Sequence, residues 1–358
     1  MKKIALMTAG GDCCGLNNII YTVVKTAKQQ GIEVLGIVDG YKGFVEGIYT
    51  ELTEDKVKDI FDVGGTILGS SNKECPFKYL VNKETNEYKD MTGVAIERLN
   101  DMGINDIIIV GGDGTLDSAR VIYENGMNVV GIPKTIDNDM GASDLTIGFE
   151  TSVEANVDAI SKIRTTAASH RRCLVVETMG RTAGFLTLYT GVASAADIIL
   201  LPELEYDLEK VCEEVDKRTE GQREVMIVIS EAAKENGKEV SVGKIVADSF
   251  EQVRYGGAAD KLAKQIESIT GIETRAQVLG YIQRGGDTCA MDRILATRLA
   301  SKALYELFNE KTSGVIVGLR NGKVQTIQFP KERIPRILVP ETDDIVIAAK
   351  NMGISFGQ

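Results

Sequence analysis

Short apolar runs alternate along the chain with longer stretches in which apolar residues recur every third or fourth position. The runs at 4–7 and 107–110 are continuous and aliphatic, as is typical of strands buried on both faces. The pattern predicts strands at 4–7, 34–38, 107–110, 128–132, 173–177, 197–200 and 225–229, and helices at about 16–30, 92–102, 116 onward, 150–168, 182–193, 208–218 and 257–269.

This alternation begins again after residue 139, with no linker rich in proline or serine between the two series. It predicts an α/β protein made of two closely packed, Rossmann-like three-layer α/β/α domains with mostly parallel sheets. Ligands of such sheets bind beyond the carboxyl ends of the strands. We therefore expect the functional site there, in the cleft between the domains.

Composition and charge narrow the classes of function. The 358 residues include 41 Lys and Arg against 52 Asp and Glu, and this net charge of −11 argues against nucleic acid as a partner. The chain has no stretch of about 18 consecutive apolar residues that would predict a membrane span, and its first residues lack the pattern of a signal peptide. The six cysteines form no Cys-x-x-Cys pair and His170 is the single histidine, so neither a zinc site nor a disulfide framework is expected. We expect a cytoplasmic protein.

Two glycine-rich loops follow predicted strands. Gly-Gly-Asp-Gly-Thr at 111–115 joins a strand to a helix, where glycines let the backbone approach a phosphate chain and the helix N-terminus supplies N–H groups. Asp113 is placed to reach a Mg²⁺ that bridges phosphate oxygens. The motif Gly-Gly-Asp at 10–12 follows the first strand in the same way, so one phosphate chain would be held from both sides. The alternative is a pair of tight turns without a ligand.

The loop at 133–139, Pro-Lys-Thr-Ile-Asp-Asn-Asp, brings two carboxylates close to a lysine. Of Asp137 and Asp139, one would take the proton of an acceptor hydroxyl and the other would bind metal or hold the loop. Lys134 and the Thr135 hydroxyl would stabilise a transferring phosphoryl group, because such transfer needs mainly alignment and charge neutralisation. The alternative is an acidic turn with solvated side chains.

Other polar residues stand beside glycines farther along the chain. The segment 64–73, which contains Asn72 and Lys73, suits an anion site or a polar surface loop equally well. Arginines at predicted strand ends suit a phosphate or carboxylate, although single arginines are more often partners of surface ion pairs. The candidate arginines are Arg172, Arg181, Arg275 and Arg284, and Met179 and Gly180 belong to the same Met-Gly-Arg segment as Arg181. The carboxylate of Glu203 would bind sugar hydroxyls or simply favour the first turn of a helix.

Together these motifs resemble those of the 6-phosphofructokinases. Gly-Gly-Asp, Gly-Gly-Asp-Gly-Thr, Pro-Lys-Thr-Ile-Asp-Asn-Asp, Met-Gly-Arg and Leu-Gly-Tyr-Ile-Gln-Arg-Gly-Gly occur in the family's order over about residues 1–320. The resemblance implies transfer of phosphate from ATP with Mg²⁺ to the 1-hydroxyl of fructose 6-phosphate, a step of glycolysis. It also implies a homo-oligomer, a tetramer or a dimer. The nucleotide-binding domain would span 1–148 plus about 283–335, and the sugar-phosphate-binding domain about 149–282 plus 336–358.

The family's functional residues carry over to matching positions of this chain. Asp137 resembles the general base, Asp139 the supporting carboxylate and Asp113 the metal-associated residue. Thr135, Arg181 and Lys134 would complete the catalytic set. The donor site would comprise Gly11, Tyr41, Asn72, Lys73, Asp113, Gly114 and Thr115. The sugar phosphate site would comprise Thr135, Asp137, Arg172, Met179, Gly180, Arg181, Glu203, Arg275, Tyr281 and Arg284, with Arg172 and Arg275 reaching it from a neighbouring subunit.

Some positions depart from the family's usual pattern. Cys14 replaces a proline of the first loop, and the segment 286–288 lacks a nearby proline. Asn72 stands where many ATP-using members have an arginine that stabilises the transferred phosphate, so Lys73 or Lys134 would supply that charge. Tyr281 stands where a histidine commonly contacts the sugar phosphate.

Two positions point to different phosphoryl donors. Pyrophosphate-dependent members share the lysine of position 134, but at the position of Gly114 they typically carry an aspartate that fills the space for the α-phosphate of ATP. Gly114 leaves that space open, and a like-charge contact there would cost on the order of several kcal/mol, so we predict ATP as the donor. The alternative is a pyrophosphate-dependent phosphofructokinase, with sedoheptulose 7-phosphate as a further acceptor.

Other functions explain fewer of the motifs. NAD kinases and diacylglycerol kinases share Gly-Gly-Asp-Gly-Thr but lack the later motifs, and a non-catalytic sensor would have lost Asp137 or Asp113. Arg164 and Lys25 match cations that bind effectors in regulated members, whereas Tyr21 replaces an arginine. We therefore expect weak control, or none, by ADP or phosphoenolpyruvate.

Overall fold

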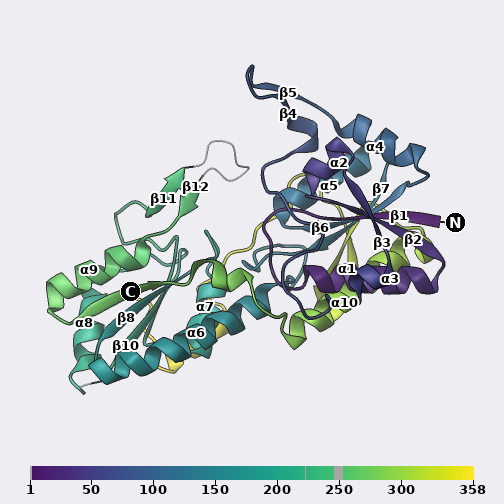
Figure 1. Cartoon of the computed structure of the whole chain (residues 1–358). Helices are drawn as coiled ribbons and strands as arrows, with labels where there is room; N and C mark the ends of the chain where they lie inside the picture. Colours follow the sequence, from purple (N-terminus) through teal and green to yellow (C-terminus); the bar gives the residue numbers. More distant parts are fainter. Residues whose placement is uncertain (1, 222, 246–252) are drawn as a thin grey trace.

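The computed structural model describes residues 2–221, 223–245 and 253–358. Two α/β lobes lie side by side, one around the strands β1, β6 and β7 and the other around β8 and β10 (Figure 1). Each lobe has a mostly parallel sheet with helices on both faces, which confirms the predicted fold class. In the described part of the chain, no helix is both long enough and apolar enough to cross a membrane.

The larger sheet has seven strands in the order β15-β14-β7-β6-β1-β2-β3. The five central strands are parallel, and the edge strands β15 and β3 are antiparallel to their neighbours. The bounds are β1 Lys2–Thr8, β2 Ile32–Ile37, β3 Tyr49–Leu52, β6 Asp106–Gly111, β7 Asn128–Pro133, β14 Val315–Arg320 and β15 Lys323–Gln328. The strands β1, β6 and β7 are parallel neighbours. The two glycine loops and the loop at 133–139, here called the carboxylate loop, therefore begin next to each other at the carboxyl ends of these strands.

Both faces of this sheet are covered. Along β1, Ile4 and Leu6 pack in one core cluster with residues of α1 and α10, while Ala5 and Met7 pack in another with residues of α2, α4 and α5. The helices of this lobe are α1 Leu16–Gln29, α2 Tyr41–Glu46, α3 Glu54–Val57, α4 Thr92–Asp101, α5 Asp113–Glu124 and α10 Ala290–Tyr305, with short helical turns η1 Pro76–Lys78 and η3 Glu306–Glu310 and a hairpin of β4 Tyr79–Asn82 and β5 Glu87–Lys89.

The second sheet has four parallel strands in the order β13-β8-β10-β9. Leu174 and Val176 of β8 belong to the same core cluster as Ile4 and Leu6, so the two lobes share a core and pack closely. The strands are β8 Cys173–Thr178, β9 Ile198–Leu200, β10 Val225–Ser230 and β13 Thr274–Val278, with a separate pair of β11 Val242–Ile245 and β12 Val253–Tyr255. The helices are α6 Phe149–His170, α7 Phe185–Ala193, α8 Leu208–Thr219, α9 Ala258–Thr270 and α11 Asp344–Asn351, with η2 Gly280–Arg284.

Two predicted helices begin at other residues in the structure. α5 begins at Asp113 instead of 116, since an aspartate in the first turn interacts favourably with the helix dipole. α7 begins at Phe185 instead of 182, because the chain first makes a turn, in which the Ala183 N–H donates to the Gly180 carbonyl oxygen at 3.0 Å, and the Gly184 N–H donates to the Glu203 side chain.

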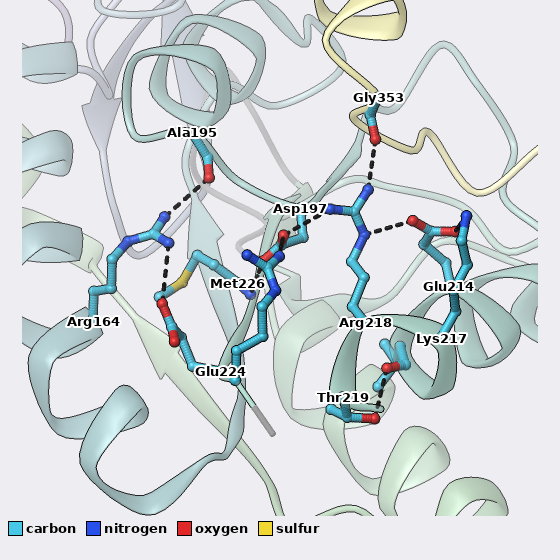
Figure 2. A network of polar contacts seen from close by, with 12 residues as sticks. Arg164, Ala195, Asp197, Glu214, Lys217, Arg218, Thr219, Glu224, Met226 and Gly353 are labelled. Carbon is cyan, nitrogen blue, oxygen red and sulfur yellow. Dashed lines mark hydrogen bonds and ion pairs between the residues drawn. The ribbon is translucent and has the colours of Figure 1, made fainter. Parts of the chain in front are cut away.

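An ionic network surrounds the buried carboxylate of Asp197 in the second lobe (Figure 2). Asp197 accepts hydrogen bonds from Arg218 (2.8 Å) and from the Met226 backbone N–H (2.8 Å). In the same network Arg164 is ion-paired with Glu224 at 3.6 Å. This network joins α6, α8, β9 and β10, and it engages Arg164 within its own chain. The expected weak response to effectors remains a prediction.

Candidate active site

The two glycine loops pack against each other through Thr115. A side chain at Gly111 would overlap Thr115, and a Cβ at Gly10 would lie 3.0 Å from its hydroxyl oxygen. The φ of Gly10 is 83°, in the left-handed region that favours glycine. The loops border a cavity of about 370 Å³. Its lining residues, which include Asn72, are Gly10, Gly11, Asp12, Gly65, Thr66, Gly69, Ser70 and Asn72.

Two predicted donor-site side chains lie beneath these loops instead of lining the cavity. Lys134 is buried, and its ammonium group donates a hydrogen bond to the Gly11 carbonyl oxygen. Burial lowers the pKa of Lys134. Tyr41 is also buried, and its hydroxyl donates to the Thr115 carbonyl oxygen at 2.6 Å. Both residues therefore support the loops, whereas Lys73 is exposed.

The carboxylate loop after β7 is shaped by Asn138, which the sequence did not single out. Asn138 has a φ of 51°, a left-handed conformation that asparagine tolerates better than most residues. Its Oδ1 accepts from the Thr146 N–H at 2.9 Å, and its Nδ2 donates to the Asp144 carbonyl oxygen at 3.3 Å. The turn holds both flanking carboxylates, those of Asp137 and Asp139, in a buried position.

Asp137 is only 3% exposed. Its backbone N–H donates to the Thr135 hydroxyl at 3.2 Å, and its Oδ2 lies 3.8 Å from Nε of Arg181. Burial, together with the charges of Asp137 and Asp113, raises the pKa of Asp139 to about 7. The loop after β7 therefore holds two buried carboxylates with arginine side chains beside them.

One of these cations, Arg336, comes from the C-terminal part of the chain. Its Nε donates to Oδ2 of Asp113 at 2.7 Å and lies 3.7 Å from Oδ2 of Asp139. Burial favours the neutral form of Asp113, but the hydrogen bond and charge of Arg336 outweigh it and lower the pKa of Asp113. Arg336 stands outside every motif discussed above, so only the three-dimensional structure reveals it.

On the opposite side of Asp137, the loop after β8 presents Arg181. A Cβ at Gly180 would lie 2.7 Å from the Ala183 carbonyl oxygen, so this tight turn requires glycine. The Arg181 N–H donates to Oε1 of Glu231 at 3.0 Å. Burial raises the pKa of Glu231 to about 7, and the charge of Asp137 adds to the effect. Glu231 directly follows β10 and lies outside every motif discussed above.

Two residues assigned to the sugar phosphate make contacts with the backbone. Oε1 of Glu203 accepts hydrogen bonds from the N–H groups of Gly184 (2.8 Å) and Val339 (2.9 Å), so this carboxylate holds the C-terminal segment to the loop before α7. Arg284 donates to the Asp12 carbonyl oxygen at 2.8 Å, and so reaches the first glycine loop.

The last four residues assigned to the sugar phosphate differ in their surroundings. The Met179 N–H donates to Oε1 of Gln283 at 3.0 Å, which ties the loop after β8 to η2. Tyr281 of η2 is 77% exposed. Arg172 and Arg275 lie at the opposite ends of β8 and β13 from this loop, and each is 2.8 Å from the Glu273 carboxylate.

Arg172 and Arg275 are therefore not brought to the site of their own chain. Arg172 directly precedes the six residues of β8 and Met179 directly follows them. At ~3.3 Å per strand residue, Arg172 and Met179 are separated by roughly 20 Å. Any contact of these arginines with a sugar phosphate would have to come from a second subunit.

The chain matches one protein family and is similar to named proteins over nearly its whole length. A family model described as Phosphofructokinase matches residues 3–307. The protein named ATP-dependent 6-phosphofructokinase 2 from Clostridium perfringens is 44% identical over 361 residues, covering 99% of this chain and 98% of the relative. The ATP-dependent 6-phosphofructokinase of Clostridium botulinum strain Hall is 40% identical over 325 residues, covering 90% of this chain and 91% of the relative.

Solved structures resemble the whole fold. Phosphofructokinase from Saccharomyces cerevisiae superimposes with a TM-score of 0.77 at 27% identity, over 91% of this chain and 44% of the yeast chain. A pyrophosphate-dependent phosphofructokinase from Marinobacter aquaeolei gives a TM-score of 0.80 at 19% identity, over 99% of this chain and 92% of that one. At that identity the second likeness concerns the fold alone.

Proposed function

The chain belongs to the phosphofructokinase family, and we propose that its cleft transfers the terminal phosphoryl group of ATP to the 1-hydroxyl of fructose 6-phosphate. The products are ADP and fructose 1,6-bisphosphate, and the reaction is a step of glycolysis. The observation that carries this proposal is the position of buried Asp137 next to two glycine loops, at the ends of three adjacent parallel strands.

Asp137 is the general base of this reaction. Its carboxylate accepts the proton of the 1-hydroxyl as the sugar oxygen attacks the terminal phosphorus, and the bond from that phosphorus to the bridging oxygen of ADP breaks. Arg181, 3.8 Å from Asp137, offsets negative charge on the acceptor side. The glycine loops and the N-terminus of α5 hold the donor phosphates in line, which is most of what phosphoryl transfer requires of a protein.

Mg²⁺ fits the donor side of the cleft. Asp113 at the mouth of the second loop already binds a cation, the guanidinium of Arg336, and carboxylates with phosphate oxygens are the ligands that Mg²⁺ prefers. Within the described ranges, no group of three His, Cys, Asp or Glu side chains is placed to hold a metal by itself. Asp113 would therefore hold Mg²⁺ jointly with the phosphates, and the ion would neutralise their charge.

The assembly and compartment belong to the same proposal. We infer a homo-oligomer, a tetramer or a dimer, in which Arg172 and Arg275 of one subunit bind the sugar phosphate at the site of its neighbour. The separation of roughly 20 Å between Arg172 and Met179 within one chain supports this reading. We further infer that the enzyme acts in the cytoplasm, with its substrates.

A crossed assay tests the proposed donor and acceptor together. Purified protein is given ATP or pyrophosphate in combination with fructose 6-phosphate or sedoheptulose 7-phosphate, and formation of the bisphosphate is followed. We expect kcat/KM to be highest with ATP and fructose 6-phosphate, by a factor on the order of 10² over pyrophosphate, because Gly114 leaves room for the α-phosphate. Faster turnover with pyrophosphate would establish the alternative enzyme.

A further inference from the structure

The C-terminal segment 329–343 crosses from the larger sheet to the second lobe along the edge of the active site. Its backbone is fixed at successive points: the Gly141 N–H donates to the Pro335 carbonyl oxygen at 2.8 Å, and the Ile337 N–H donates to the Asp139 carbonyl oxygen at 2.8 Å. Met140 and Arg336 form an antiparallel bridge between these two bonds. The backbone on both sides of Arg336 is therefore hydrogen-bonded to the end of the carboxylate loop.

The packing at this crossing requires a glycine. A Cβ at position 141 would lie 2.7 Å from the Pro335 carbonyl oxygen and 2.9 Å from Cγ of the same proline. Farther along, the Val339 N–H donates to Glu203, so the segment is held on both sides of Arg336. The guanidinium of Arg336 can turn about its own side-chain bonds, but its origin is fixed beside Asp139.

The cleft needs a cation at this place. Asp113, Asp137 and Asp139 would repel a transferring phosphoryl group unless nearby charges neutralise them. Asn72, which lines the cavity beside the first glycine loop, is neutral. Of the two lysines considered as substitutes, Lys134 is buried against the Gly11 carbonyl oxygen. Lys73 and Arg336 are both exposed, and of these two it is Arg336 that is ion-paired with Asp113.

We propose that Arg336 contacts the terminal phosphoryl group of bound ATP and stabilises its charge during transfer. This inference rests on the proposed function, with ATP as the donor. A metal held by Asp113 would compete with the present hydrogen bond of Arg336, and the fixed backbone would keep the displaced guanidinium within reach of the same phosphate oxygens. A guanidinium has five N–H donors in a fork that matches a phosphate group.

The test compares two nucleotides that differ in the terminal phosphate. ADP and the non-hydrolysable imido analogue of ATP, each with Mg²⁺, are titrated calorimetrically into the unchanged protein, Arg336→Met and the control Arg333→Met. Arg333 is exposed on the same segment. We expect Arg336→Met to weaken the analogue about tenfold, the loss of one charge-assisted contact, while the affinity for ADP changes less than about twofold. The control should bind both nucleotides normally.

Turnover supplies the second readout. With ATP, kcat of Arg336→Met should fall by a factor on the order of 10², with KM for fructose 6-phosphate unchanged within about threefold. Arg336→Lys should recover part of this loss. If Arg336→Met does not fold, the neutral variant Arg336→Gln replaces it in both measurements.

Three results overturn the role of Arg336: equal weakening of ADP and the analogue, unchanged affinity for both, or kcat within about threefold of the unchanged protein. If the unchanged protein binds neither nucleotide, the proposed donor is wrong and the inference falls with it. If the unchanged protein binds both nucleotides, and Arg336→Met binds each of them as tightly as the unchanged protein does, the inference alone is wrong.

Discussion

Burial of charged groups is the property of single residues on which this cleft depends most. Asp137, Asp139 and Lys134 are buried, and Glu231 is partly buried beside Arg181. Burial raises the pKa of both Asp139 and Glu231 to about 7. These carboxylates lower the stability of the fold when ionised, in return for a concentrated charge next to the reacting groups.

The cost of Glu231 is measurable as a dependence of stability on pH. Its pKa is raised from 4.5 to about 7 in the folded protein, so its contribution to stability is present below pH 4.5 and is lost as the pH rises through 7. As the pH rises from 5 to 8, Glu231→Gln should gain stability relative to the unchanged protein, by on the order of 3 kcal/mol in free energy of unfolding. Urea denaturation at both pH values measures this, and a difference that does not vary with pH would contradict it.

The limits of sequence reasoning are clearest at this scale. The glycine loops and the Asp137 loop could be predicted, because strand ends and glycine spacing are local properties of the chain. The support roles of Tyr41 and Lys134 could not, since nothing local shows whether a side chain lies above or beneath a loop. Arg336 reaches Asp113 only through tertiary folding, and it lies 223 residues away in sequence.

At the scale of elements, the pattern of apolar and polar residues decided which helices and strands could be predicted from the sequence. The strands and helices predicted up to residue 269 all occur, because each shows a continuous apolar run or a one-sided stripe. β13, β14, β15, α10 and α11 were not predicted. α10 has Asp292 on its buried face and Met291 and Ile294 on its exposed face, so its hydrophobic pattern does not mark it as a helix, and β15 is a largely polar edge strand.

One carboxylate joins two of these helices. Asp292 of α10 is fully buried and accepts hydrogen bonds at the start of α6 from the Gly148 N–H (3.0 Å), the Thr151 N–H (2.8 Å) and the Thr151 hydroxyl (2.6 Å). A carboxylate at this position satisfies N–H groups that the helix itself leaves without acceptors, and it interacts favourably with the helix dipole.

Removing this carboxylate should weaken the link between α6 and α10 and so lower the stability of the protein. Asp292→Ala should lower the free energy of unfolding by about 3 kcal/mol, because buried donors lose their acceptor. Asp292→Asn retains one acceptor oxygen and should lose about half as much. Chemical denaturation measures both variants, and a stability of Asp292→Ala within about 0.5 kcal/mol of the unchanged protein would contradict the proposed link.

At the scale of the whole molecule, two lobes with a shared core bring the donor loops of one lobe and the Arg181 loop of the other to the carboxylates of the loop after β7. The division into domains at about residues 148, 282 and 335 stays a prediction. Arg172 and Arg275 lie at the opposite end of their sheet from the loop with Arg181, which makes the complete site a property of the assembly in our proposal.

Mixed oligomers test whether subunits share a site. Asp137→Asn removes the base of its own subunit, whereas Arg172→Ala removes a phosphate contact that we assign to the neighbour's site. Each variant alone should be impaired. After dissociation and reassembly of an equal mixture, sites that pair Asp137 of one variant with Arg172 of the other should be complete, and activity should rise well above the sum of the two. A mixture that shows only the sum would place Arg172 outside the neighbour's site.

The most direct test of the account is the turnover of Asp137→Asn with ATP and fructose 6-phosphate. Asparagine keeps the size of the side chain but cannot accept the hydroxyl proton as a base. We predict that kcat falls by a factor on the order of 10³ or more, while KM for fructose 6-phosphate and the melting temperature change little. A variant that retains the turnover of the unchanged protein would contradict the assignment of Asp137 as the base.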